Sequence, residues 1–138
     1  MMKVSTRGRY ALRLMVELAK REQDTPVSLK KISIGQEISY KYLEQIVKSL
    51  TGAGILRSVR GAQGGYLLNV SPEQITVGEI LRVTEGSLTP VSCLNDTETP
   101  EEEDCNRQEK CEVYDFWKGL QDVVSEYIDS VTLHDMIK

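Results

Sequence analysis

Three cysteine residues in the second half of the 138-residue chain are the clearest candidates for chemistry. Eleven residues separate Cys93 from Cys105, and five separate Cys105 from Cys111. This spacing differs from the paired cysteines of zinc ribbons and thioredoxin-like sites, and the odd count argues against structural disulfides. Buried structural cysteines usually lie in apolar elements, whereas these lie among Asn, Asp, Glu and Lys residues. We therefore expect an iron–sulfur or zinc site. Thiolates are soft ligands that bind both, so the ligand type alone does not distinguish the two.

A polar face on a predicted helix is the second candidate site. Apolar residues share one side of the segment 40–51 because they recur at helical spacing, namely Leu43, Ile46, Val47 and Leu50. The other side carries the polar stripe, which consists of Lys41, Glu44, Gln45 and Lys48. Such a stripe can reach base edges and phosphates from the major groove of DNA. An ordinary solvated helix face is the alternative interpretation.

A glycine-rich turn between two predicted strands is the third candidate. The strands cover residues 55–60 and 66–70, and the turn at 61–65 holds residues that accept positive φ. Arg57 and Arg60 precede the tip, where they can meet phosphates or a narrow minor groove. Gly64 and Gly65 allow the backbone to approach DNA closely. A hairpin that follows a helix-turn-helix is a wing, so the pattern predicts a second DNA-contacting element.

The charges are divided between the two halves of the chain. Residues 1–70 hold 12 Lys or Arg and 5 Asp or Glu, for a net +7, whereas residues 71–138 hold 5 and 16, for a net −11. A positive first half favours binding to a polyanion. No apolar run is long enough for a membrane helix and the N-terminus lacks a secretory signal, so we expect a cytoplasmic protein. Because no nucleophile–base pair or nucleotide motif is recognisable, we do not expect an enzyme.

Helices must position these groups. Apolar spacing and capping residues predict helices over 8–22, 29–37, 40–51, 77–85 and 112–130, with a short final helix after Thr132. Ser28 and Ser39 are the expected N-caps, and Thr76 with Glu79 predicts a reciprocal capping box. The helix over 112–130 carries an apolar seam that suits packing on a second copy of the chain, with packing inside one subunit as the alternative.

The pattern predicts a mainly α fold with a small β-hairpin. A winged helix-turn-helix DNA-binding domain is expected over residues 1–86, and a cysteine-containing cluster loop over 87–111. A dimerisation helix with a C-terminal cap is expected over 112–138.

Four sequence motifs follow one another along the chain. They are STRGRYAL at residues 5–12, YLEQ at 42–45, VRGAQGGY at 59–66 and TVGEI at 76–80. In order and spacing they resemble the Rrf2 family of winged helix-turn-helix transcription regulators, and most of all its iron–sulfur regulators of the IscR type. The resemblance implies a homodimer on a pseudo-palindromic operator, with the helix over 40–51 in the major groove. It places Lys41, Glu44 and Gln45 at base contacts and Arg60 in the minor groove.

The resemblance also implies a [2Fe–2S] cluster on Cys93, Cys105 and Cys111. The cluster state would set operator affinity, so that the protein senses iron–sulfur supply or oxidative stress and controls cluster-assembly genes. The chain departs from the pattern in a longer segment between the first two cysteines. It also has Tyr114 where a histidine completes the site in IscR-like proteins. Candidates for the fourth ligand are Asp104, Glu109, Tyr114, His134 or a residue of a second subunit.

Other functions stay open from the residues alone. A nitric-oxide sensor of the NsrR type also uses three cysteines and a non-cysteine ligand. A regulator of cysteine metabolism of the CymR type needs no cluster. A protein–protein adaptor that has lost DNA binding is a further class, and the polar stripe and positive first half argue against it.

Overall fold

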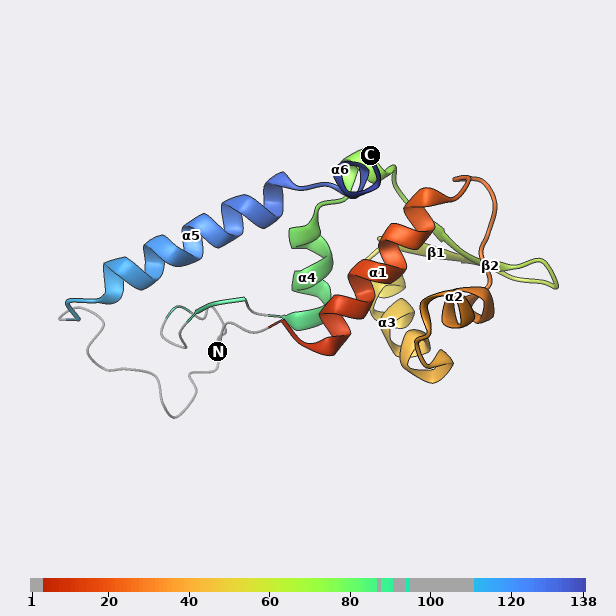
Figure 1. The fold of residues 1–138 in the computed structure, drawn as a ribbon, viewed down its shortest axis with the longest axis horizontal. Coiled ribbons are helices and arrows are strands. Elements are labelled where there is room, and N and C mark those ends of the chain that lie inside the picture. Colours follow the sequence, from red (N-terminus) through yellow and green to blue (C-terminus); the bar gives the residue numbers. More distant parts are fainter. Residues whose placement is uncertain (1–3, 87, 91–93, 95–110) are drawn as a thin grey trace.

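The computed structural model describes residues 4–86, 88–90, 94 and 111–138, with the elements arranged as in Figure 1. The first three helices are α1 (Thr6–Lys20), α2 (Leu29–Gln36) and α3 (Tyr40–Gly52). An antiparallel hairpin follows, formed by β1 (Leu56–Val59) and β2 (Gly65–Leu68). A short 3₁₀-helix, η1 (Pro72–Gln74), leads into α4 (Val77–Glu85), and the chain ends with α5 (Tyr114–Ser130) and α6 (Leu133–Ile137).

Serine hydroxyls begin the first three helices. Ser28 and Ser39 accept hydrogen bonds from the backbone N–H three residues on, at 3.2 and 3.4 Å, as the sequence predicts. Ser5 caps α1 in the same way, so that α1 begins two residues before the predicted start at residue 8. The helix ends at Lys20 rather than at residue 22, because Arg21 turns to an extended backbone.

The turn between α2 and α3 holds one residue in an uncommon conformation. Glu37 has φ 56° and ψ 43°, in the left-handed region that side chains other than glycine seldom adopt. The next residue, Ile38, is buried, and its N–H donates to the Ser33 carbonyl at 3.1 Å. Burial of Ile38 therefore helps to set the angle between α2 and α3. The left-handed backbone at Glu37 is the strained residue of this turn.

The hairpin is attached to the body by a third backbone segment. Val27, in the loop before α2, exchanges hydrogen bonds with Tyr66 of β2 at 3.1 and 2.9 Å. Gly65 makes this approach possible, because a Cβ there would lie 2.2 Å from the Val27 carbonyl oxygen. The strands are slightly shorter than predicted, and the turn between them projects beyond α2 (Figure 1).

One apolar core joins elements from both ends of the chain. Its largest fully buried side chains include Leu14 and Met15 of α1, Ile32 of α2, Leu43, Ile46 and Leu50 of α3, Ile80 of α4 and Leu133 of α6. The α2–α3 unit with the following hairpin, packed on α1 and α4, is a winged helix-turn-helix. The predicted fold class, mainly helical with a small hairpin and a long C-terminal helix, is confirmed. The division of the chain at residues 86 and 111 stays a prediction.

The C-terminal segment leaves this body and then returns to it. The N–H of Val77 donates to the Val131 carbonyl at 2.9 Å, and the N–H of Leu133 donates to the Ile75 carbonyl at 3.0 Å. These two bonds pair Thr76 with Thr132 in an antiparallel bridge. Leu133 is then fully buried, so α6 belongs to the core.

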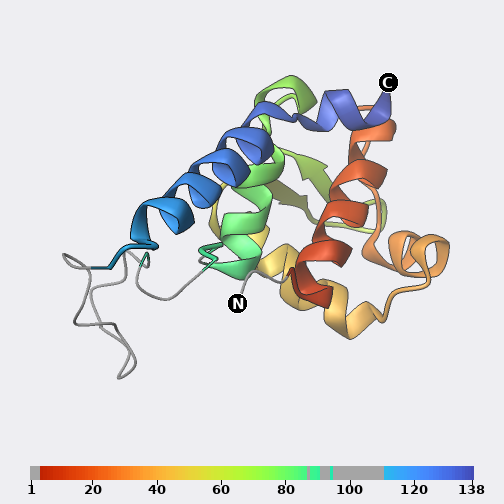
Figure 2. The same cartoon turned by 60° about the vertical axis from the view of Figure 1, so that its left-hand side comes forward.

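Helix α5 contributes nothing to the core. None of its residues is buried, and Phe116, Val123 and Tyr127 are 64%, 64% and 69% exposed. Both views show α5 leaving the body beside α6, with its first turns projecting past the other helices (Figures 1 and 2). The described residues thus leave part of the predicted apolar seam uncovered, whereas Leu120 and Val124 are half-buried. Among the described residues, no helix is long and apolar enough to cross a membrane.

Threonines begin α4 and α6. Thr76 accepts from the Glu79 N–H at 3.1 Å, which is the first half of the predicted box. The complete reciprocal box forms instead at α6, where Thr132 and Asp135 bond each other's backbone N–H groups at 3.0 and 3.2 Å. The Thr132 backbone bond and the Lys138 ammonium hold the pKa of Asp135 below its usual range.

Replacing Glu37→Gly should stabilise the protein by about 1 kcal/mol, because glycine adopts the left-handed conformation without a Cβ clash. The free energy of unfolding in urea, at fixed protein concentration, measures the effect. Glu37→Ala keeps the Cβ and is the matched control. Equal stability of the Gly and Ala variants would show that the turn is not strained.

The α6 cap should make stability depend on pH. The Asp135 pKa is lowered by folding, so its stabilisation is present above the unfolded pKa and is lost as pH falls through the folded one. Asp135→Ala should therefore lower the urea midpoint at neutral pH, and the difference from wild type should stay constant down to about pH 5 and shrink as the pH falls below about 4. Asp122→Ala, which removes only an exposed pair with Lys118 at 3.9 Å, is the control. A difference that is constant with pH would exclude the ionised cap.

Candidate nucleic-acid interface

Packing of one side of α3 fixes what its other side presents. Leu43, Ile46, Val47 and Leu50 are all buried, as their spacing predicts. The polar stripe lies on the opposite side, and each of its four side chains is exposed. The stripe therefore forms a continuous row of two cations, a carboxylate and an amide along a rigid helix. These groups can donate to and accept from base edges.

A shallow groove joins the polar stripe to the hairpin. Its lining residues come from both elements and are Glu44, Lys48, Thr51, Gly52, Ser58 and Tyr66. Ser58 and Tyr66 are directly opposite each other across the two strands. Spacing along the sequence does not mark Tyr66 for the site, because the pairing of β1 with β2 is what brings it to α3.

The two predicted wing arginines lie in different places. Arg60 follows β1 at the start of the turn and is exposed. Arg57 is also exposed, but strand alternation puts it on the hairpin face opposite Ser58 and Tyr66. The groove therefore does not bring Arg57 to the polar stripe, whereas Arg60 lies at the free end of the hairpin.

The two wing glycines have a folding role. A Cβ on Gly64 would lie 2.1 Å from the Val59 carbonyl oxygen, and one on Gly65 would clash with Val27. The turn therefore requires glycine at position 64, and attachment of the hairpin to the body requires it at position 65. Their close approach to DNA stays a prediction.

Arg7 connects α1 to the helix that carries the polar stripe. Its Nη2 donates to Ser49 Oγ at 2.6 Å, and Ser49 Oγ donates to the Gln45 carbonyl at 3.3 Å. The Arg7 Nε is buried and has no hydrogen-bond partner among the described residues. Sequence reasoning did not assign Arg7 to the site, although it lies within the STRGRYAL motif. It is 42 residues from Ser49 along the chain, so spacing could not reveal the contact.

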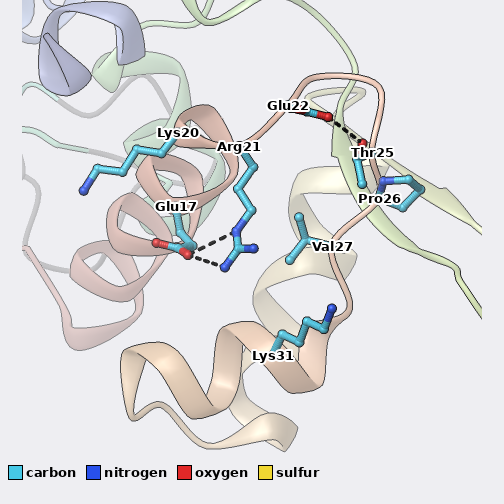
Figure 3. Close-up of a pocket in the computed structure, with 8 residues that line it drawn as sticks. All are labelled: Glu17, Lys20, Arg21, Glu22, Thr25, Pro26, Val27 and Lys31. Atoms are coloured by element: carbon cyan, nitrogen blue, oxygen red, sulfur yellow. Dashed lines mark hydrogen bonds and ion pairs between the residues drawn. The ribbon is translucent and has the colours of Figure 1, made fainter.

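A second hollow lies beside the end of α1 and the loop before α2 (Figure 3). Within it, Arg21 pairs with Glu17 at 2.8 Å, and the Thr25 hydroxyl donates to Glu22 at 3.4 Å. Glu17 also accepts from the Gln36 amide at 3.3 Å, and Lys20 points away from the other lining residues. Because Arg21 and Glu17 pair with each other and Lys20 points away, these charges do not converge on a ligand.

Only one of the three predicted metal ligands lies within the described residues. Cys93 and Cys105 are outside them. Cys111 is a half-buried free thiol just before α5, and its carbonyl accepts from the Tyr114 N–H at 3.3 Å. The part of the chain that the structure describes holds no group of three or more His, Cys, Asp or Glu residues suited to a metal ion.

Comparison with known proteins gives matches along nearly the whole chain. A sequence model of the Rrf2 family, described as an iron-dependent transcriptional regulator, matches residues 4–138. The HTH-type transcriptional regulator CymR of Bacillus subtilis (strain 168) is 44% identical over 98% of this chain and 89% of its own length. The HTH-type transcriptional regulator IscR of Aliivibrio salmonicida is 34% identical over 99% of this chain and 77% of its own length.

Solved structures of both branches are also similar. CymR (YrzC), the global cysteine regulator of B. subtilis, has a TM-score of 0.77 at 43% identity and covers 99% of this chain and 97% of its own. T. potens IscR has a TM-score of 0.72 at 38% identity and covers 98% and 85%. The names of these relatives denote transcriptional regulators and not enzymes. The resemblance inferred from four motifs is confirmed, and the chain belongs to the Rrf2 family of transcriptional regulators.

Proposed function

We propose that this chain is a DNA-binding transcriptional regulator that acts as a homodimer on a pseudo-palindromic operator. Each α3 enters a major groove, and each wing lies over the adjacent minor groove. The observation that carries the proposal is the exposed polar stripe on a buried helix, joined by a groove to a projecting hairpin. The net charge of +7 over residues 1–70 supports contact with phosphates.

Within this proposal the side chains have different roles. Lys41 and Gln45 donate to base acceptors, and Lys48 meets phosphates from the groove beside the hairpin. Glu44 accepts from a cytosine amino group or repels phosphate, which makes it a selective contact. Arg60 reaches the minor groove from the tip of the wing.

The dimer forms through α5. Its exposed Phe116, Val123 and Tyr127 have no cover within the described chain, and a large apolar face of this kind marks an interaction surface. A second copy is the occupant with a matching helix, because a two-fold axis places identical faces against each other. Two recognition helices then bind two half-sites.

Two proposals compete for the signal that controls DNA binding. In the first, Cys93, Cys105 and Cys111 hold a [2Fe–2S] cluster, which supplies a redox-sensitive group just before α5. The half-buried, disulfide-free thiol of Cys111 fits a ligand role, and the family description as iron-dependent supports it. In the second, the protein is a cluster-free regulator of cysteine metabolism. The 44% identity to CymR and the tyrosine at position 114 favour this alternative.

Arg60→Ala should weaken operator binding about tenfold or more, equivalent to about 1.4 kcal/mol, because the variant has no cation to place in the minor groove. The probe is a fluorescent duplex that the wild-type chain selects from a random-sequence pool, and anisotropy measures affinity. The slope of log affinity against log salt should fall by about 0.9 for each phosphate that the variant no longer neutralises. Arg21→Ala removes an equal charge from the same half but away from α3 and the wing, so it should change affinity little. Equally weakened binding in both variants would show that Arg60 contributes only its positive charge and makes no specific contact from the wing.

Cys111→Ala should separate the two proposals for the signal. If a cluster is present, the anaerobically purified wild-type chain shows visible charge-transfer absorption with about equal iron and sulfide, and the variant loses both while keeping its circular dichroism. An undiminished spectrum in Cys111→Ala would remove this thiol from the ligand set. A colourless wild-type chain that cannot be reconstituted would favour the cysteine-metabolism regulator and leave the DNA-binding proposal intact.

A further inference from the structure

Among the described residues, an ion pair joins α5 to the winged helix-turn-helix. Arg82 of α4 donates from both terminal nitrogens to the Asp129 carboxylate, with Nη1–Oδ1 at 2.6 Å and Nη2–Oδ2 at 2.9 Å. A two-bond contact between a planar guanidinium and a carboxylate fixes direction as well as distance. The hydrogen bonds raise the pKa of Arg82 and lower that of Asp129, so both groups stay charged at neutral pH.

A glycine makes room for this pair. A Cβ on Gly78 would lie 2.0 Å from Asp129 Oδ1 and 2.8 Å from Arg82 Nη1. The obstructed atoms are the ends of flexible side chains, so an alanine at position 78 displaces the pair without breaking the helix. Gly78 is buried near the start of α4, next to the Val77–Val131 backbone bond.

Stability alone does not account for the arrangement. Both side chains are nearly half exposed, at 44% and 45%, and exposed ion pairs contribute little to folding. No residue of α5 is buried, so the core does not hold this helix along its length. The backbone bonds at Val131 and Leu133 hold its C-terminal end in place, and the side-chain pair adds a second fixed point close by. Together these two attachments fix the angle at which α5 leaves the body.

The angle between α5 and the body matters because α5 is long, so a small tilt displaces its far end by several ångströms. With 17 residues it extends about 25 Å, so a tilt of about 10° moves its far end by about 4 Å. Neighbouring base pairs are about 3.4 Å apart along DNA, so a displacement of this size corresponds to about one base pair.

We propose that the Arg82–Asp129 pair, in the space left by Gly78, sets the separation of the two recognition helices and thereby the half-site spacing that the dimer accepts. The inference rests on the proposed function, in which α5 forms the dimer. Arg82 and Asp129 are positioning residues in this proposal. They touch no base, and they act through the direction in which α5 leaves α4.

The test compares spacing preference with half-site affinity. The probes are the duplex selected by the wild-type chain, derivatives with one or two base pairs added or removed at its centre, and a duplex with one half-site. The proteins are wild type, Arg82→Gln, Gly78→Ala and the control Lys118→Gln, which removes the exposed Lys118–Asp122 pair on the same α5 helix. Light scattering checks that each protein is a dimer.

We expect wild type and Lys118→Gln to prefer the selected spacing by about tenfold or more, as a rigid dimer should. Arg82→Gln and Gly78→Ala should reduce this preference to about threefold or less, while half-site affinity and dimer mass stay unchanged. Two different changes to one contact guard against a folding defect in either variant.

Three results would count against the proposals. Retention of the full spacing preference in both variants would overturn the inference alone. A fall in half-site affinity in parallel with spacing preference would also overturn it, because the pair would then support the DNA-binding fold itself. A monomeric wild-type chain, or one that selects no duplex, would overturn the proposed function and the inference with it.

Discussion

Burial of the apolar side of α3 is the constraint on which the rest of the structure depends. Because Leu43, Ile46 and Leu50 are fully enclosed, the helix has no freedom to rotate, and its polar side must face outward. The strained turn at Glu37, the Arg7–Ser49 contact and the Val27–Tyr66 bridge all act around that fixed helix. Each one limits where the polar stripe lies relative to the wing.

Local signals explain what could be predicted from the sequence. Periodicity assigned α3 and its two faces, and the serines at 28 and 39 marked helix starts, because these features depend on neighbours a few residues away. Contacts between distant residues carried no such signal. The burial of Leu133 and the pairing of Arg82 with Asp129 depend on the return of the chain after α5. The exposure of the polar stripe on α3 could be predicted, whereas the contacts of Tyr66 and Arg7 and the separate placement of Arg57 were missed for the same reason.

The two regulator branches among the relatives share a single architecture. CymR and IscR both superpose over nearly the whole of this chain, at TM-scores of 0.77 and 0.72. A common architecture therefore serves transcriptional regulators of two branches. Fold alone does not determine the signal in such a case.

The antiparallel bridge between Thr76 and Thr132 has a consequence for how such proteins diversify. The residues on either side of this bridge are neighbours in space although 56 positions separate them along the chain. The chain from the start of α4 to the start of α6 is thus a closed excursion, and the bridge holds its two ends together. Added length in such a closed excursion costs little, since loop entropy grows slowly with length. An insertion between α4 and α5 therefore leaves the two paired ends of the excursion in place.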